Sequence, residues 1–228
     1  MYPPWSRAGD RRSVTERIGH RRMPAKGRTK GQRTEAAFLA AAREVFAEKG
    51  YFNAKISDIA ARAGRSPGSF YNYYDNKEQL LQALLVSFGS EVLSGVLPRG
   101  GASSPEEGVR AAVTAYWTTY KSYLPEMIGL FQMSMTDAAF RQRWREVRSL
   151  GIQGVLGGLQ AAERGGQQIG LPLELLASAL VGALESFCWT WLAAGGDDDV
   201  PAPDDDLAID VLSAIWFRTV YGRPAVEH

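Results

Sequence analysis

The stretch that decides the fold is SDIAARAGRSPGSFYNYY, residues 57–74. Its first half has the composition of a short helix ending at Gly64, a residue that adopts positive φ at no steric cost. Ser66 is then a typical helix cap, and Pro67 follows at the first helical position, where its missing N–H costs nothing. Two short helices joined by a turn that contains glycine predict a helix-turn-helix. The second helix of such a pair, expected here from Ser66 to Tyr74, lies in the major groove of DNA.

Helical spacing continues on both sides of this stretch. Upstream, apolar residues recur at helical spacing from Thr34 and the segment closes at Gly50, and downstream Asn76 can cap a helix that runs to about Leu97. A Pro/Gly/Ser loop follows at 98–104. Beyond it we expect helices at about 105–123, 126–136, 138–164, 173–194 and 205–221. No segment alternates apolar and polar residues as a strand does, so the sequence predicts an all-α fold of about nine helices.

The wider segment SDIAARAGRSPGSFYNYYDNKEQLLQAL, residues 57–84, resembles the tetracycline-repressor (TetR/AcrR-type) family of transcriptional regulators. The shared pattern is an Ile-Ala pair, an Ala-Gly turn, Ser-x-Gly, Tyr-x-x-aromatic and Lys-Glu-x-Leu, and the resemblance covers roughly residues 33–82. Three residues depart from it: Lys55 replaces a common threonine, Arg65 an apolar residue and Tyr74 a phenylalanine. The resemblance implies a three-helix DNA-binding domain followed by a helical domain that binds a ligand and dimerises.

Several residues of the motif are candidates for DNA contact. Asn72 can pair with a base or a phosphate, and Tyr71 and Tyr73 offer hydroxyls to the DNA backbone. The resemblance implies that Gly68 and Ser69 approach bases while Tyr73 and Lys77 contact phosphate. Lys77 also begins a helix, whose first N–H groups attract anions. The predicted DNA-binding set is Lys55, Arg65, Ser66, Gly68, Ser69, Tyr71, Asn72, Tyr73 and Lys77, with core packing the alternative for the tyrosines.

Charge and composition divide the chain into three parts. Residues 1–32 form a basic arm without apolar periodicity, which we expect to be disordered. Residues 33–82 form the expected DNA-binding domain, with its motif at about 55–74, and residues 83–228 the ligand-binding and dimerisation domain. Residues 1–33 carry a net charge of +8 against −7 for the rest. The arm is therefore a solvated tail, a source of phosphate contacts, or both.

The second domain is rich in aromatic residues, which carry polar tips that need partners in a tight core. Core packing explains many of them, but such a domain also readily lines an apolar ligand cavity. The predicted pocket residues are Tyr116, Trp117, Tyr120, Phe131, Gln132, Met135, Phe140, Trp144, Phe187 and Trp189. Four glycines follow one another at helical spacing, and we interpret them as a helix-packing face: Gly151, Gly154, Gly157 and Gly158.

The resemblance implies that the last two long helices pair with their copies in a homodimer. Small residues allow close helix approach in one of them, and the other carries an apolar stripe. The predicted interface comprises Ser178, Ala179, Gly182, Leu212, Ile215 and Trp216.

Other chemistry finds little support in the sequence. His20 and His228 are the only histidines, which disfavours nucleophilic catalysis and hence an enzyme. The Asp197–Asp199 and Asp204–Asp206 runs are typical of a linker and a helix start rather than a metal site. We expect no cofactor and no membrane span, and the single cysteine, Cys188, favours the reducing cytoplasm.

Taken together, these patterns predict a ligand-responsive repressor. A homodimer would bind a palindromic operator in double-stranded DNA, and a small, largely apolar or aromatic inducer would release it. The alternative is a DNA-binding activator or organiser that has no small-molecule inducer.

Overall fold

The computed structural model describes residues 29–96 and 104–222, and within these ranges every regular element is helical. This confirms the predicted all-α fold. The helices are α1 (Lys30–Asn53), α2 (Ile56–Arg62), α3 (Pro67–Phe70), α4 (Lys77–Val96), α5 (Pro105–Ser122), α6 (Leu124–Thr136), α7 (Ala138–Arg164), α8 (Leu173–Cys188) and α9 (Asp205–Tyr221). A π-helical turn, Trp189–Ala193, extends α8. Most of the basic arm, which we expected to be disordered, lies outside the described residues, as do residues 97–103.

Two helix ends differ from the sequence prediction. α1 begins at Lys30 because Thr29 and Gln32 form a capping box, in which Thr29 Oγ1 accepts from Gln32 N at 3.3 Å and Gln32 Oε1 accepts from Thr29 N at 2.9 Å. α3 ends at Phe70, where we expected it to continue to Tyr74, and the chain turns through residues 71–73 instead.

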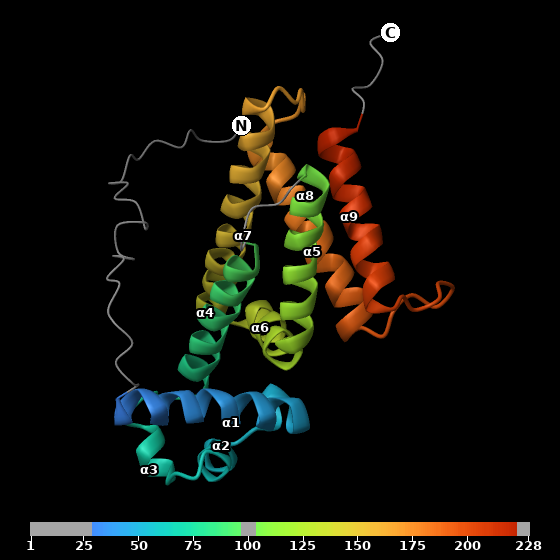
Figure 1. Cartoon of the computed structure of the whole chain (residues 1–228). Helices are drawn as coiled ribbons and strands as arrows, with labels where there is room; N and C mark the ends of the chain where they lie inside the picture. The colour runs from blue at the N-terminus through green and yellow to red at the C-terminus, as the bar shows by residue number, and fades with distance from the viewer. Residues whose placement is uncertain (1–28, 97–103, 223–228) are drawn as a thin grey trace, which may run out of the picture.

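The nine helices of the described residues form a small reader (α1 to α3) at one end and a larger body (α4 to α9) above it (Figure 1). α1 lies across the base of the body, α2 and α3 lie on its far side, and α4 runs from them into the body (Figure 1). Within the body, α7 packs on α8, α5 on α4 and α9, and α6 on α7. α6 and α4 of the body also pack on α1 of the reader.

Two hydrophobic clusters hold this arrangement together. The larger runs from the reader into the body and includes Phe38 and Phe70 together with Trp117 and Phe140. Burying a side chain such as Phe38 stabilises the fold by about 1.5–3 kcal/mol. The smaller cluster lies among α7, α8 and α9 and is built from Leu159, Leu176, Ala177, Leu180 and Val220.

α8 and its π-helical turn form the most apolar segment of the described chain. Leu173–Ala193 is long and apolar enough to cross a membrane by length and composition alone. One face of α8, however, is buried in the body by Leu176, Leu180, Val181 and Leu184. Packing against α7 and α5 therefore accounts for the apolar character of that face.

Candidate nucleic-acid interface and ligand cavity

The turn between α2 and α3 has the geometry that the sequence predicts for a helix-turn-helix. Gly64 has φ +65°, and Arg65 N donates to Ala60 O at 2.9 Å, which closes α2 with a left-handed cap. Ser66 Oγ accepts from Ser69 N at 3.2 Å, and Pro67 occupies the first turn of α3. These local interactions fix the angle at which α3 leaves α2.

Phe70 anchors α3 to the reader. Its ring is fully buried and meets Phe38 of α1 edge-on, with the ring centroids 5.5 Å apart. Because Phe70 points into the core, the residues on the opposite side of α3 and in the turns beside it face outward. The exposed members of the predicted DNA-binding set are Lys55, Arg65, Ser66, Gly68, Tyr71 and Asn72, while Ser69 and Tyr73 are half-buried.

The tyrosines that follow Phe70 have different environments. Tyr71 is 56% exposed and available to a partner. Tyr74 is 5% exposed, and its hydroxyl has no hydrogen-bond partner in the described chain. Burial, with a smaller contribution from Glu35, raises the pKa of Tyr74 to about 12. Core packing is therefore the role of Tyr74 and not of Tyr71.

The side chain of Lys77 is directed away from the exposed face. Its Nζ donates to the carbonyls of Tyr51, Phe52 and Ala54 at 2.6, 3.2 and 3.0 Å, at the end of α1. Loss of hydration lowers the pKa of this ammonium. The three donors of the ammonium are thereby used within the chain. This corrects the predicted phosphate contact of the Lys77 side chain, which instead ties α4 to α1.

An ion pair between a buried carboxylate and a partly exposed arginine joins the reader to the body. Glu126, in the first turn of α6, is completely buried, and Arg43 Nε of α1 lies 3.5 Å from its Oε1. Arg43 also donates to Ser122 O at 2.6 Å, and its Cζ lies 3.9 Å from the centroid of the Tyr123 ring. Desolvation raises the pKa of Glu126 to about 7, although its own backbone N–H and Arg43 act in the opposite direction.

The body contains a partly open cavity of about 540 Å³ between the two hydrophobic clusters. Five helices line it, and each contributes a face of small or apolar side chains. They are α4 with Val92 and Leu93, α5 with Gly108, Val109, Ala112 and Tyr116, α7 with Gly151, Gly154, Val155, Gly158 and Leu159, α8 with Val181 and Leu184, and α9 with Trp216, Val220 and Tyr221. Ser104, Pro105 and Ala161 complete the described lining, in which no side chain is charged.

Glycines of α7 create much of this space. A Cβ atom added at Gly154 or Gly158 would meet nothing within 4 Å, whereas one at Gly151 would touch Val181 at 3.9 Å. Gly157, which lies outside the cavity lining, is equally open. Among the described residues of a single chain, no neighbouring helix comes within contact distance of the other three, so the predicted helix-packing role is wrong there for all but Gly151.

A polar group of residues lies next to the inner end of the cavity. A smaller space shares Tyr116 and Gly151 with the cavity lining and adds Arg148 and Glu185. Arg148 Nε donates to Glu185 Oε2 at 2.8 Å, and its other nitrogens donate to Ser178 O at 2.9 Å and Ser178 Oγ at 3.3 Å. Desolvation raises the pKa of Glu185 above its usual value, partly offset by Arg148.

Comparison with known proteins assigns the reader. The sequence model of the family described as bacterial regulatory proteins, tetR family, matches residues 38–84, which span the larger part of α1, then α2, the turn, α3 and the start of α4. The HTH-type transcriptional repressor AcnR of Corynebacterium diphtheriae is 28% identical over 178 residues, which cover 78% of this chain and 90% of AcnR. Residues 38–84 therefore form a DNA-binding domain of the tetR family. A chain with this domain is a DNA-binding regulator of transcription.

Solved structures of tetR-family proteins share the fold of both reader and body. A TetR-family regulator from Syntrophomonas wolfei superposes with a TM-score of 0.72 at 17% identity, covering 87% of this chain and all of that one. The transcriptional regulator FadR of Bacillus subtilis, solved in complex with stearoyl-CoA, has a TM-score of 0.63 at 19% identity, covering 82% of this chain and 98% of FadR. At these identities the likeness extends to the fold alone.

The structure separates the predicted pocket residues into three groups. Tyr116 lines the cavity, and Trp144 lines the smaller space beside it. Trp117, Tyr120 and Phe140 are packed in the core, at 2–3% exposure. The rest lie away from the cavity: Phe131, which stacks on Trp189 at 4.3 Å, Phe187, and the exposed Gln132 and Met135.

The predicted interface residues are also divided. Ala179 and Ile215 are exposed on α8 and α9. Leu212 is 4% exposed within a single chain, so it belongs to the core rather than to a contact surface. Ser178 accepts hydrogen bonds from Arg148, a Cβ at Gly182 would meet Arg148 Nη2 at 3.3 Å, and Trp216 lines the cavity.

The sequence did carry one usable signal for the cavity. Gly151, Gly154 and Gly158 are spaced at i, i+3 and i+7, which aligns them on one face of α7. Such a face permits either close helix packing or an open space, and only the position of the neighbouring helices distinguishes the two. The aliphatic lining residues, such as Val92 and Val181, have no local signature of a cavity wall.

Proposed function

We propose that this protein is a ligand-responsive repressor that binds a palindromic operator as a homodimer in the cytoplasm. Residues 33–82 would bind DNA, and residues 83–228 would bind the ligand and dimerise. The exposed residues Arg65, Gly68, Tyr71 and Asn72 at the outer side of α3 support the first assignment. Two recognition helices of a dimer, set about one DNA turn apart, would read the two halves of the palindrome.

The observation that carries the ligand proposal is the cavity. A volume of about 540 Å³ lies within the usual range for small-molecule sites, and its described lining is apolar with few polar groups. An empty cavity of this size lowers the stability of the fold, because its lining lacks packing partners. A protein that binds a ligand in the cavity regains those contacts when the ligand is bound. The alternative, an organiser or activator without an inducer, predicts a solid body and so is less well supported.

The relatives support the same choice. AcnR is named a repressor, and FadR of Bacillus subtilis was solved with stearoyl-CoA. Stearoyl-CoA carries a long apolar chain, so this complex supports an apolar ligand for a protein of the same fold. We therefore propose a small, largely apolar inducer for this protein as well.

The helices that line the cavity suggest how binding would reach the DNA. Val92 and Leu93 of the cavity wall belong to α4, which begins at the end of the reader, and Met127 beside the inner end belongs to α6, which packs on α1. An occupant that displaces α4 or α6 would change the spacing of the two readers. Such an inducer must bind the released geometry more tightly than the DNA-bound one, or no shift follows.

A cavity-filling substitution tests the proposal. Gly158→Leu places a side chain into open cavity space, because an added Cβ there meets nothing within 4 Å. Compounds that release the wild-type protein from its own promoter DNA, found by fluorescence anisotropy, should need at least ~10-fold higher concentrations with the variant. DNA affinity without compound should be unchanged, and removing a helical glycine should stabilise the fold by about 0.5–1 kcal/mol.

Gly157→Leu is the matched control. It lies on the same helix, is equally open, and gains the same helix propensity, but it does not line the cavity. It should respond to the inducer as the wild type does. Equal responses of Gly158→Leu and the wild type would contradict a ligand site in this cavity.

A further inference from the structure

The chemistry of the cavity restricts the charge of its occupant. None of its described lining residues is charged, and most present carbon atoms only. A charged group buried among them would lose its hydration without gaining a counterion, at a cost that such a site cannot offset. The part of the ligand in the main cavity must therefore be uncharged and mainly apolar.

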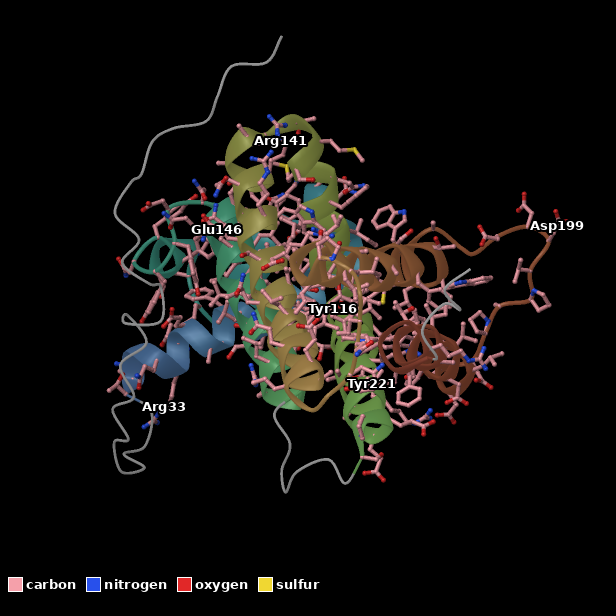
Figure 2. The ribbon with its side chains drawn as sticks, turned by 90° about the horizontal axis from the view of Figure 1, so that it is seen from above. Arg33, Tyr116, Arg141, Glu146, Asp199 and Tyr221 are labelled. Carbon is pink, nitrogen blue, oxygen red and sulfur yellow. The ribbon has the colours of Figure 1, made fainter. Side chains whose placement is uncertain are left out.

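Polar partners for a ligand lie at the inner end. The hydroxyl of Tyr116 has no hydrogen-bond partner among the described residues, although its ring packs on Phe88 and Tyr120. Tyr116 lies in the middle of the body, among α5, α7 and α8 (Figure 2). It lines both the cavity and the smaller space that reaches Arg148 and Glu185. A hydroxyl without a partner beside an apolar cavity can donate a hydrogen bond to an acceptor atom of a ligand.

The neighbouring ion pair decides which kind of acceptor fits. Arg148 and Glu185 compensate each other at 2.8 Å, with side chains that are 25% and 15% exposed. A carboxylate placed beside Tyr116 would face Glu185 and compete with it for Arg148, while an ammonium would face Arg148. An uncharged carbonyl oxygen accepts a hydrogen bond from Tyr116 and leaves the pair intact.

We propose that the inducer is an uncharged, mainly apolar molecule with a carbonyl oxygen at one end, which accepts a hydrogen bond from Tyr116 Oη while the apolar tail fills the cavity. This assignment rests on the proposed function, because it names the ligand class of the same site. It makes Tyr116 the residue that determines head-group specificity. Acids and amines with the same tail are excluded by the Arg148–Glu185 pair.

A series of probes with one tail and different heads tests the assignment. 2-Decanone, decanoate and decylamine are titrated into the full-length protein by isothermal titration calorimetry. 2-Decanone should bind at least ~10-fold more tightly than either charged probe, because neither charge finds a free counterion. Equal or tighter binding of decanoate or decylamine, or no binding of 2-decanone, would overturn the proposal.

Tyr116→Phe tests the hydrogen bond itself, since it keeps the ring contacts and removes only the hydroxyl. Affinity for 2-decanone should fall about 3- to 10-fold, as for the loss of one neutral hydrogen bond. The infrared carbonyl band of bound, ¹³C-labelled 2-decanone should also return to the position of an unbonded ketone. Unchanged affinity and an unchanged band would overturn the role of Tyr116.

Tyr221→Phe is the matched control, because Tyr221 lines the same cavity from the end of α9, where its ring stacks on Phe217 at 5.0 Å. It should leave both the affinity and the band unaltered, and an equal loss in this variant would contradict the specific assignment to Tyr116. The proposed function has a separate readout, the release of promoter DNA. If 2-decanone binds with the expected selectivity but does not release DNA, the repressor proposal fails and the ligand assignment stands.

Discussion

At the scale of single residues, Lys77 shows how a positive charge is used inside the reader. Its ammonium lies at the C-terminal end of α1, where the last carbonyls of the helix are unpaired and carry the negative end of the helix dipole. It also lies 4.5 Å from the centroid of the Tyr51 ring. The side chain therefore satisfies several acceptors at once and holds the start of α4 against α1.

Replacing this cation should cost stability before it costs DNA contacts. Lys77→Met keeps the aliphatic stem and removes the donors, so we expect the free energy of unfolding in urea to fall by about 1–3 kcal/mol. Lys55→Met, at an exposed position, is the control and should leave it unchanged. An unaltered unfolding curve for Lys77→Met, combined with weaker binding to all DNA sequences, would restore the phosphate-anchor interpretation.

The difference between Lys77 and its neighbours explains what could be predicted at this scale. The caps by Ser66 and Asn76 and the positive φ of Gly64 depend on partners within a few residues, so the sequence reveals them. The carbonyl partners of Lys77 lie 23–26 residues away in the chain. Local sequence contains no record of that approach, and the helix start alone suggested an anion partner.

At the scale of helices, the contact between α1 and α6 depends on a carboxylate that is costly to ionise. Apart from its own backbone N–H, Glu126 has no hydrogen-bond partner in the described chain, and Arg43 is the one cation near it there, itself 34% exposed. On the α4 side, Tyr123 packs between Arg43 and Glu91, to which its hydroxyl donates. The contact is therefore sensitive to whether Glu126 carries a proton.

The stability of the protein should fall as pH rises toward 7. Folded Glu126 has a pKa of about 7, whereas the unfolded chain releases this proton near pH ~4.3. Between these values the folded state binds more protons, so the contribution of Glu126 is complete below ~4.3 and is lost as pH rises through 7. We expect a loss of about 1–3 kcal/mol in unfolding free energy between pH 5 and 8.

Glu126→Gln removes the titrating group and should flatten this profile, leaving the variant more stable than the wild type at pH 8. Urea unfolding at several pH values measures both effects. Glu163→Gln, at an exposed site on α7, should retain the wild-type slope. Parallel profiles for the wild type and Glu126→Gln would show that Arg43 keeps Glu126 ionised throughout.

The positions of the helices could be predicted from the sequence, but which side chains of each helix pack in the core and which line the cavity could not. Apolar periodicity and caps located nine helices, including the Asp204 cap of α9, in which Leu207 N donates to Asp204 Oδ1 at 2.8 Å. The same periodicity could not distinguish Trp117, in the core, from Tyr116, in the cavity wall, although both lie on α5. Which apolar face meets a neighbour and which meets space depends on the packing of five helices.

At the scale of the whole molecule, α8 and α9 leave apolar side chains uncovered. On α9, Leu207, Val211 and Ile215 follow one another at intervals of four residues and are 53%, 40% and 51% exposed. On α8, Leu175 is 69% exposed, and Ala179 lies one turn further on. Aligned exposed residues of this kind typically mark a contact surface. They support the proposed dimer, and they test it better than Leu212 and Gly182, which the sequence also predicted for the interface.

Charge placed on this surface should separate the two chains. Leu175→Glu and Ile215→Glu would each bury a carboxylate in an apolar dimer interface, which costs several kcal/mol when no counterion is near. Because both positions are exposed in the single chain, the fold should survive, whereas Gly182→Glu would meet Arg148 of its own chain. Sedimentation velocity should show monomers, and affinity for a palindromic operator should fall at least ~10-fold because each monomer reads one half-site.

Val86→Glu is the control: the residue is 63% exposed on α4, away from this surface, so the variant should stay dimeric. Dimers that persist in both interface variants, with wild-type operator affinity, would mean that the chains associate through another face.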